Sequence, residues 1–274
     1  MLQVSSPLVS IKWLKEHLNH PDLVILNASL GKPQTDSTNI ISEMQIPKTR
    51  LFDIKTRFSD GTAPFPNTFP SLEQFVTEAK SLGISDNSCI IVFDEKGIYS
   101  SARVWWMFKA FGHTNVAVLN GGLPSWKKAG FGLEPYEDYT GTIGDFSAKL
   151  DPSFMAFFKD MEDMVHNKSH TIVDARSESR FLGLEEEPRA GLRAGNIPTS
   201  KNLPFENLLE NGEFKSKEVL KKLIDTVAEQ DKPMVFSCGS GITACILALG
   251  AEMIGYKELS VYDGSWTEWG TLVK

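Results

Sequence analysis

The chain contains an internal repeat, and this repeat constrains the fold more than any other feature. Sliding the sequence by 143 positions without a gap superposes matching segments, namely Ile91-Val92-Phe93 on Met234-Val235-Phe236, Asn120-Gly121 on Asp263-Gly264 and Trp126 on Trp269. Matched spacing over such a distance is typical of a duplicated structural unit. We therefore expect two copies of one domain.

Each copy alternates short apolar runs with helical patterns. The sequence predicts strands at 23–27, 89–94, 116–119, 171–174 and 234–237, and helices at 10–19, 71–81, 101–111 and from 243 onward. Alternation of this kind is typical of a mostly parallel sheet with helices on both faces. The predicted fold class is α/β, with two such domains in tandem.

The join between the copies is marked by a loss of periodicity. Residues 131–160 contain proline and glycine at irregular intervals, at Pro135, Gly141, Gly144 and Pro152. Such a stretch is typical of a linker between compact domains. We expect a first domain over 1–132, a linker over 133–158 and a second domain over 159–274.

The segment 233–247 combines a strand, a small-residue loop and a helix around Cys238. Gly239 and Gly241 allow a sharp turn whose backbone N–H groups point inward. A cysteine that faces such amides and the start of a helix is favoured as the thiolate. The alternative is an inert buried cysteine at a strand end. The repeat places Glu95 at the equivalent position, so we expect chemistry in the second half alone.

Two other motifs overlap this loop. Gly239-x-Gly241-x-x-Ala244 matches a dinucleotide-binding fingerprint, with Asp263 at the expected distance. Too few residues follow Asp263 to complete a doubly wound nucleotide domain. A phosphate-transfer cysteine loop would need an arginine where this chain has Ala244. Nucleotide binding stays open as an alternative that predicts thermal stabilisation by NAD, and phosphatase chemistry is disfavoured.

Composition excludes several classes of partner. The formal net charge is -7 and the pI is about 5.3, which argues against nucleic acid or an anionic membrane as the main partner. The three cysteines are too few and odd in number for a disulfide framework, so we expect a reducing compartment. The sequence shows no secretory signal and no run of membrane-spanning length, which favours the cytoplasm. The histidines show no metal-binding spacing, and we expect no metal and no cofactor.

Arginine is concentrated after the strand at 171–174. Of seven arginines, four lie within eighteen residues, at Arg176, Arg180, Arg189 and Arg193. Segments that leave the carboxyl ends of parallel strands converge on one edge of the sheet, where ligands bind. Arginine there would match a carboxylate. Surface pairing with Glu178 and with the glutamates at 185–187 explains the cluster equally well at this stage.

At this point the chain resembles a known family. Cys238-Gly239-Ser240-Gly241-Ile242-Thr243-Ala244 is similar to the active-site loop of the 3-mercaptopyruvate sulfurtransferases, which belong to the rhodanese superfamily of two-domain sulfurtransferases. Further matches run along nearly the whole chain, at Phe52-Asp53-Ile54, Arg103-Val104-Trp105-Trp106, Asp174-Ala175-Arg176, Glu187-Pro188-Arg189 and Tyr262-Asp263-Gly264-Ser265-Trp266. The resemblance implies two tandem rhodanese-like domains, with no catalytic cysteine in the first.

The resemblance also implies a mechanism. The thiolate of Cys238 takes the sulfur of 3-mercaptopyruvate, pyruvate leaves, and the persulfide passes its sulfur to a thioredoxin, a small thiol or cyanide. Arg180 and Arg189 are implied to bind the carboxylate and ketone oxygens of the donor. The loop amides of Gly239, Gly241, Ile242 and Thr243 are implied to stabilise the sulfur. Ser240 is implied to assist proton movement, with Asp53 as a more distant relay candidate.

Two positions depart from the family pattern. Relatives usually have histidine in the proline-rich first-half loop, where this chain has Asn67, and the usual Gly-His-Ile-Pro-Gly turn appears here as Gly195-Asn196-Ile197-Pro198-Thr199. Asparagine does not titrate near neutrality. We therefore predict that a proton relay uses Ser240, the substrate or water, and that Asn67→Ala does not abolish turnover.

Three readings of the function stay open from the sequence. The first is a 3-mercaptopyruvate sulfurtransferase, because members that prefer thiosulfate usually carry basic residues directly after the cysteine, where Gly239 and Ser240 stand here. The second is a thiosulfate sulfurtransferase that uses cyanide as acceptor. The third is a persulfide carrier or binding module without turnover of its own. Cys89 and Cys245 are expected in the core, and a disulfide between Cys238 and Cys245 stays an alternative.

Overall fold

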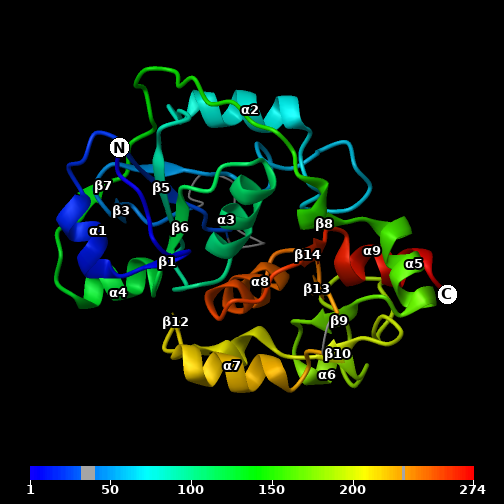
Figure 1. The fold of residues 1–274 in the computed structure, drawn as a ribbon. Helices are drawn as coiled ribbons and strands as arrows, with labels where there is room; N and C mark the ends of the chain where they lie inside the picture. The colour runs from blue at the N-terminus through cyan, green and yellow to red at the C-terminus, as the bar shows by residue number, and fades with distance from the viewer. Residues whose placement is uncertain (32–40, 230–231) are drawn as a thin grey trace. The chain divides into compact units, whose positions relative to one another are not determined.

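The computed structural model describes residues 1–31, 41–229 and 232–274 (Figure 1). The chain divides into two compact units. Unit 1 comprises Met1–Asp60, Phe69–Asp151 and Asn211–Phe214, and unit 2 comprises Gly61–Thr68, Pro152–Glu210 and Lys215–Lys274. Each unit therefore contains one short segment that comes from the other half of the sequence. The domain boundaries expected at 132 and 158 stay predictions.

Unit 1 is built on a parallel sheet of five strands in the order β1-β6-β5-β2-β4. Its elements are β1 (Leu8–Val9), α1 (Ile11–His17), β2 (Leu23–Asn27), β3 (Met44–Gln45), β4 (Thr49–Leu51), α2 (Leu72–Ser81), β5 (Cys89–Phe93), α3 (Ser101–Ala110), β6 (Val116–Leu119), α4 (Gly122–Lys128), β7 (Glu134–Pro135) and β12 (Glu213–Phe214). β3 and β7 form a separate antiparallel pair.

Helices cover both faces of this sheet because its central strands are apolar on both sides. Every residue of β5 is buried, and Ile91 packs with Leu14 of α1 and Trp126 of α4. On the other face, Phe75 of α2 and Phe108 of α3 join a cluster of aromatic rings. Figure 1 shows α1 and α4 on one side of the sheet and α3 on the other. The first turns of α1 and α2 are capped by the hydroxyls of Ser10 and Ser71, which accept hydrogen bonds from backbone N–H groups.

Unit 2 has a second parallel sheet, in the order β10-β9-β13-β14-β8. Its elements are η1 (Pro152–Phe154), β8 (Met155–Ala156), α5 (Phe158–Asn167), β9 (Thr171–Asp174), α6 (Glu178–Phe181), β10 (Lys201–Asn202), η2 (Phe205–Leu208), β11 (Leu209–Glu210), α7 (Lys217–Asp225), β13 (Met234–Ser237), α8 (Ala244–Met253), β14 (Leu259–Tyr262) and α9 (Ser265–Leu272). β8 lies inside the stretch expected as a linker.

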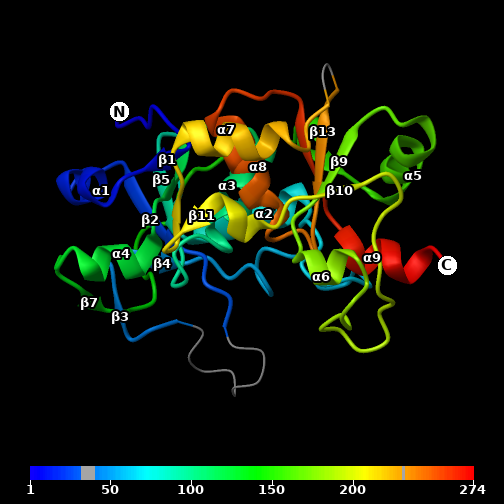
Figure 2. The ribbon, with the colours of Figure 1, turned by 90° about the horizontal axis from the view of Figure 1, so that it is seen from below.

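The second sheet is also covered on both faces. Val235 packs in one cluster with Met161 of α5 and Trp269 of α9. α8 packs against β13 and β14 on the other face and is followed outward by α7. Figure 2 shows α7 and α8 on one side of β13, β9 and β10, and α5 and α9 on the other. Residues 244–251 of α8 are all buried, which explains its uniformly apolar sequence.

The two sheets have the same topology. β8, β14, β13, β9 and β10 of unit 2 follow the order that β1, β6, β5, β2 and β4 follow in unit 1. The predicted duplication and the α/β class are therefore confirmed. Within the described ranges, none of the helices combines the length and apolar character needed to cross a membrane.

Candidate active site

The loop that contains Cys238 connects β13 to α8 in unit 2. β13 pairs with β9 in a register that sets Ser237 opposite Asp174, so Cys238 follows the carboxyl end of a central strand. Its exposed fraction is 2 %. Gly241 adopts a φ of +74°, which an L side chain rarely adopts, and this turn leads directly into α8. The strand, loop and helix predicted from the sequence are all present.

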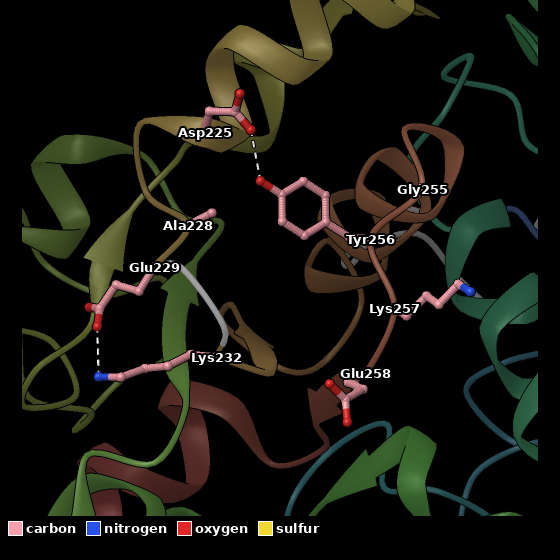
Figure 3. Close-up of a pocket in the computed structure, with 8 residues that line it drawn as sticks. All are labelled: Asp225, Ala228, Glu229, Lys232, Gly255, Tyr256, Lys257 and Glu258. Atoms are coloured by element: carbon pink, nitrogen blue, oxygen red, sulfur yellow. Dashed lines mark hydrogen bonds and ion pairs between the residues drawn. The ribbon is translucent and has the colours of Figure 1, made fainter.

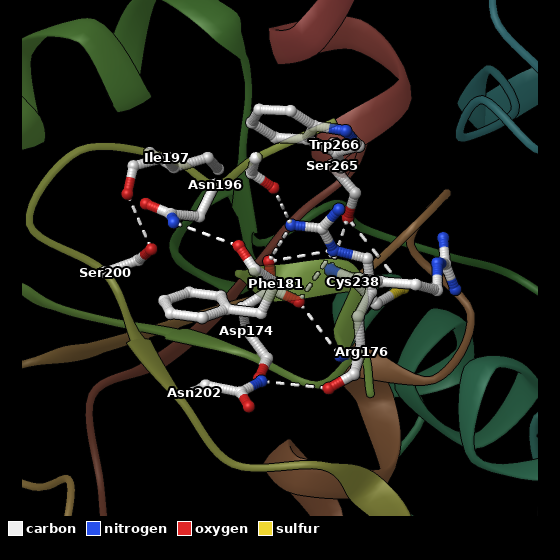
Figure 4. A network of polar contacts seen from close by, with 12 residues as sticks. Asp174, Arg176, Phe181, Asn196, Ile197, Ser200, Asn202, Cys238, Ser265 and Trp266 are labelled. Atoms are coloured by element: carbon white, nitrogen blue, oxygen red, sulfur yellow. Dashed lines mark hydrogen bonds and ion pairs between the residues drawn. The ribbon is translucent and has the colours of Figure 1, made fainter. Parts of the chain in front are cut away.

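Ser265, at the start of α9, holds the cysteine loop from the side. Its Oγ accepts hydrogen bonds from the backbone N–H groups of Cys238 and Gly241, at 3.0 and 3.1 Å. The hydroxyl donates to the carbonyl of Tyr262 at 2.9 Å and also lies 4.0 Å from Sγ of Cys238 (Figure 4). One hydroxyl proton can therefore serve either the carbonyl or the sulfur.

The backbone of Ser265 shows that this position is specialised. Its φ is +50°, which is uncommon for a residue with a side chain. The repeat aligns Ser265 with Gly122, whose φ is +52°. At this position the second unit thus keeps the positive φ of the glycine in the first unit and adds a side-chain hydroxyl. In the sequence, Ser265 stands within a family motif, and the change from Gly122 to Ser265 between the two copies is the signal that marks its role.

The next residues of α9 hold the other side of the loop. The N–H of Trp266 donates to the carbonyl of Cys238 at 3.0 Å, and the N–H of Thr267 donates to the carbonyl of Gly239 at 2.9 Å. The Thr267 hydroxyl also donates to the carbonyl of Gly239. These bonds occupy loop carbonyls, which favours an inward orientation of the loop amides.

Ser240 and Asn67 lie in direct contact. Nδ2 of Asn67 donates to Oγ of Ser240 at 3.0 Å, and both residues belong to unit 2. Asn67 has a φ of +61°, a conformation that asparagine tolerates better than most residues. Because Ser240 accepts this bond, its own hydroxyl proton points elsewhere. Ser240, Ile242 and Thr243 are 9 %, 5 % and 9 % exposed.

The two predicted donor-binding arginines converge on the loop. A Cβ atom built on Gly239 would stand 3.2 Å from Nη2 of Arg180 and 3.9 Å from Nη1 of Arg189. Arg189 also donates to the Thr267 hydroxyl at 3.1 Å. Gly239 therefore leaves room for the two guanidinium groups directly beside Cys238. The structure brings together Cys238, Ser240, Arg180 and Arg189, although their roles stay predictions.

Arg180 is held by a buried ion-pair network. Arg176 donates to both oxygens of Asp174, at 2.7 to 3.1 Å, and to Oε1 of Glu187 at 2.7 Å. Oε2 of Glu187 then accepts from Nη2 of Arg180 at 2.5 Å. Asp174, Arg176 and Glu187 side chains are each 1 % exposed. The sequence left open that these arginines pair with glutamates at the surface. The structure shows that Glu187 does pair with Arg176 and Arg180, but as a buried carboxylate.

Arg176 stays charged inside this network. Burial works against the charged form, but the hydrogen bonds and charges of Asp174 and then Glu187 outweigh it and raise the pKa of Arg176. Its guanidinium lies 4.7 Å from the centre of the Trp266 ring (Figure 4). Since Trp266 directly follows Ser265, the network and the cysteine loop are packed as one body.

Asp53, the predicted relay candidate, lies in unit 1. Its carboxylate accepts from the N–H groups of Lys55 and Thr56 at 3.0 and 3.1 Å and from the Thr56 hydroxyl. These bonds cap the turn that follows β4. A relay role for Asp53 stays a prediction.

The loop of unit 1 at the position equivalent to the cysteine loop is filled by carboxylates. Oδ2 of Asp94 accepts from the N–H groups of Tyr99, Ser100 and Ser101, at 2.8 to 3.1 Å, and from the Ser101 hydroxyl. Glu95 accepts from Ser42 and Gln45. An internal anion thus occupies the amides that could otherwise bind a ligand.

The remaining cysteines are core residues, as the sequence predicts. Cys89 and Cys245 are both 0 % exposed. Burial, followed by the charge of Asp22, raises the pKa of the Cys89 thiol to about 11. Cys245 donates to the carbonyl of Gly241 at 3.4 Å. All three cysteines are free thiols.

A hollow on unit 2 contains none of the predicted site residues. It is lined by Asp225, Ala228, Glu229, Lys232, Gly255, Tyr256, Lys257 and Glu258 (Figure 3). The Tyr256 hydroxyl donates to Asp225 at 2.7 Å, and Lys232 pairs with Glu229 at 2.7 Å. Burial and then this hydrogen bond raise the pKa of Tyr256 to about 12. Four of the polar lining residues therefore pair with one another, Tyr256 with Asp225 and Lys232 with Glu229.

Comparisons with known proteins agree with this geometry. The rhodanese-like domain family matches residues 10–129 and 158–272. The 3-mercaptopyruvate sulfurtransferase of Mus musculus is 39 % identical over 97 % of this chain and 93 % of its own length. The mitochondrial thiosulfate/3-mercaptopyruvate sulfurtransferase 1 of Arabidopsis thaliana is 37 % identical over 98 % of this chain and 77 % of its length.

A solved structure shows the same fold. The crystal structure of SseA from Escherichia coli, of the 3-mercaptopyruvate sulfurtransferase type, matches with a TM-score of 0.86 and 32 % identity. The match covers 96 % of this chain and 99 % of the SseA chain. The chain therefore belongs to the rhodanese superfamily and is a sulfurtransferase with two rhodanese-like domains in tandem.

Proposed function

We propose that this protein is a 3-mercaptopyruvate sulfurtransferase that forms a persulfide on Cys238 and releases pyruvate. The observation that carries the proposal is the convergence of Arg180 and Arg189 on Gly239, directly beside the cysteine. Two guanidinium groups suit a 2-oxo acid, which offers a carboxylate and a ketone oxygen on adjacent carbons. Relatives of similar length carry this activity in their names.

The sulfur transfer balances without a cofactor. The Cys238 thiolate attacks the donor sulfur, the carbon–sulfur bond breaks, and its electron pair stays on the carbon as the enolate of pyruvate. The proton that the enolate carbon needs can come from the donor's own thiol. Ser240 is suited to move it, because Asn67 donates to the Ser240 oxygen and leaves the hydroxyl proton available.

The persulfide that remains on Cys238 is anionic and needs donors of hydrogen bonds. We assign this role to the backbone amides of Gly239, Ile242 and Thr243, with the Ser265 hydroxyl 4.0 Å from the sulfur of Cys238. The N–H of Gly241, also predicted for this role, instead donates to Ser265 Oγ and holds that hydroxyl beside the sulfur. The outer sulfur then passes to a thiophilic acceptor, for which a thioredoxin, a small thiol or cyanide is chemically suitable. The Cys238 thiolate is regenerated.

Thiosulfate is the alternative donor, since one relative has both donors in its name. The residues after Cys238 argue against it as the better donor, because Gly239 and Ser240 supply no positive charge. Three free thiols fit a reducing compartment, and we propose the cytoplasm. Subcellular fractionation with an antibody against this chain tests the location, and recovery in the mitochondrial fraction would overturn it.

Steady-state kinetics test the proposed activity. The protein should release pyruvate from 3-mercaptopyruvate repeatedly when cyanide or a small thiol is present, with a kcat/KM well above that for thiosulfate. Cys238→Ser should release none, whereas Cys89→Ala, which changes a core thiol of unit 1, should stay active. A single turnover that cyanide and small thiols do not accelerate would instead favour a persulfide carrier.

A further inference from the structure

Glu187 is a buried carboxylate held between two arginines. Oε1 lies 2.7 Å from Nη1 of Arg176, and Oε2 lies 2.5 Å from Nη2 of Arg180. Its side chain is 1 % exposed, whereas that of Arg180 is 23 % exposed. The buried carboxylate thus holds one end of a guanidinium group that stays accessible.

The atom that Glu187 holds is the one that faces the cysteine loop. Nη2 of Arg180 lies 3.2 Å from the position of a Cβ atom on Gly239. A donor anion that binds Arg180 therefore also feels the negative charge of Glu187. Charges this close interact strongly because little water separates them.

The charges around this position nearly cancel. Asp174 balances Arg176 through a bidentate pair, and Glu187 balances Arg180. Arg189 contacts the neutral hydroxyl of Thr267 through the same nitrogen that approaches Gly239. The network with its two donor-binding arginines therefore offers one net positive charge to an incoming donor.

We propose that Glu187 determines donor specificity by limiting this charge to one. 3-Mercaptopyruvate carries one negative charge near neutral pH, because its carboxylate is ionised and an ordinary thiol is protonated there. Thiosulfate carries two. The carboxylate of Glu187 therefore favours the monoanion and disfavours the dianion. Glu187 acts through Arg180 as a positioning residue. This inference rests on the proposed sulfurtransferase function.

The test is a change of charge without a change of shape. Glu187→Gln should raise the ratio of kcat/KM for thiosulfate to kcat/KM for 3-mercaptopyruvate by about tenfold or more, because a dianion gains twice as much from a lost repulsion as a monoanion. Glu186→Gln is the matched control. Glu186 is the exposed neighbour, so water and salt screen its charge and the ratio should not change.

A second variant separates charge from geometry. Glu187→Asp keeps the charge and shortens the side chain, so KM should rise for both donors while their ratio stays within about twofold of the unmodified protein. The proposal would be overturned if the ratio of kcat/KM for thiosulfate to kcat/KM for 3-mercaptopyruvate did not change in Glu187→Gln. It would also be overturned if Glu187→Asp changed this ratio as much as Glu187→Gln does. A general loss of stability lowers both activities and leaves their ratio unaffected.

A measurement on the unmodified protein keeps the proposal testable if Glu187→Gln does not fold. Pyruvate, a monoanion, should slow alkylation of Cys238 by iodoacetamide at lower concentration than sulfate, an unreactive dianion, at equal ionic strength. Stronger protection by sulfate would overturn the inference. Failure of the unmodified protein to use 3-mercaptopyruvate would instead remove the proposed function, so the two failures are distinguishable.

Discussion

The two equivalent loops of this protein have the same position in the fold, but one contains carboxylates and the other contains a cysteine. In unit 1, Asp94 and Glu95 fill the loop after β5, and Asp94 accepts hydrogen bonds from three successive N–H groups. In unit 2, the aligned residues are Ser237 and Cys238, and the loop after β13 keeps no carboxylate of its own. The difference indicates that the backbone N–H groups of such a loop form an anion-binding site. Either an internal carboxylate or a substrate can occupy that site.

The neighbouring helix shows the same contrast. Gly122 begins α4 in unit 1, and Ser265 begins α9 in unit 2, with φ angles of +52° and +50°. The serine hydroxyl binds the loop amides of Cys238 and Gly241. The second copy therefore adds one hydrogen-bonding group where the first has none, close to the sulfur.

The largest effect should come from giving unit 2 the carboxylate of unit 1. Ser237→Asp should place an internal anion on the loop amides and lower kcat/KM for 3-mercaptopyruvate by about 1000-fold, since such donors carry the stabilisation of the reacting anion. Ser237→Ala, which adds no charge, should stay within about fivefold of the unmodified protein. Full activity of Ser237→Asp would break the comparison between the loops.

Removal of the cations beside the second loop should have the next largest effect. Arg180→Ala and Arg189→Ala should each lower kcat/KM for 3-mercaptopyruvate by about 10- to 100-fold, because each removes a charge-assisted hydrogen bond. Only Arg180→Ala should also lower the free energy of unfolding, by about 2 kcal/mol, since it leaves the buried Glu187 with one partner fewer. Equal unfolding midpoints in urea for the two variants would contradict the buried network.

Ser265→Gly makes the second loop resemble the first and should have a smaller effect. The loss of the hydroxyl should lower kcat about tenfold, as expected for one hydrogen bond near the reacting sulfur. The unfolding temperature should change little, because glycine relieves the positive φ. Ser265→Ala should lose the same activity and also stability. An unchanged kcat in both variants would show that the Ser265 hydroxyl has no part in turnover.

Asn67 should matter least. Its amide orients Ser240 but does not titrate, so Asn67→Ala should lower kcat by less than about tenfold, measured with 3-mercaptopyruvate at saturating concentration. Asn67→Gly is the control for backbone strain, since φ is +61° here. Loss of turnover in both variants, with the fold intact by circular dichroism, would refute a relay through Ser240, substrate or water.

Much of the fold and part of the site follow from the sequence because they depend on local patterns. The repeat predicted two domains of one fold, and the rule that segments leaving parallel strands converge on one edge placed the arginine-rich stretch near the cysteine loop. The roles of Arg180 and Arg189 were implied only by the family resemblance. Strands β9 and β13 have their predicted bounds, because each has a short apolar run, Ile172-Val173 or Met234–Phe236, next to a polar residue at its carboxyl end. The repeat also marked Glu95 as the residue aligned with the cysteine.

The rest depends on contacts between distant segments. A run of charged residues such as 185–187 normally lies at the surface, and only the packing of Arg176 under the loop shows that Glu187 is buried. The hydrogen bonds of Ser265 require the start of α9 to meet the cysteine loop, 27 residues away in sequence. Segment 61–68 joins unit 2 through contacts, including that of Asn67 with Ser240, that no local pattern predicts.

The central claim is that the second loop alone carries the transferred sulfur, and mass spectrometry tests it directly. After incubation with 3-mercaptopyruvate and removal of small molecules, the intact protein should gain the mass of one sulfur atom, and peptide mapping should locate it on Cys238. Cys238→Ser should gain none. Absence of the added mass, or its presence on Cys89 or Cys245, would contradict the account.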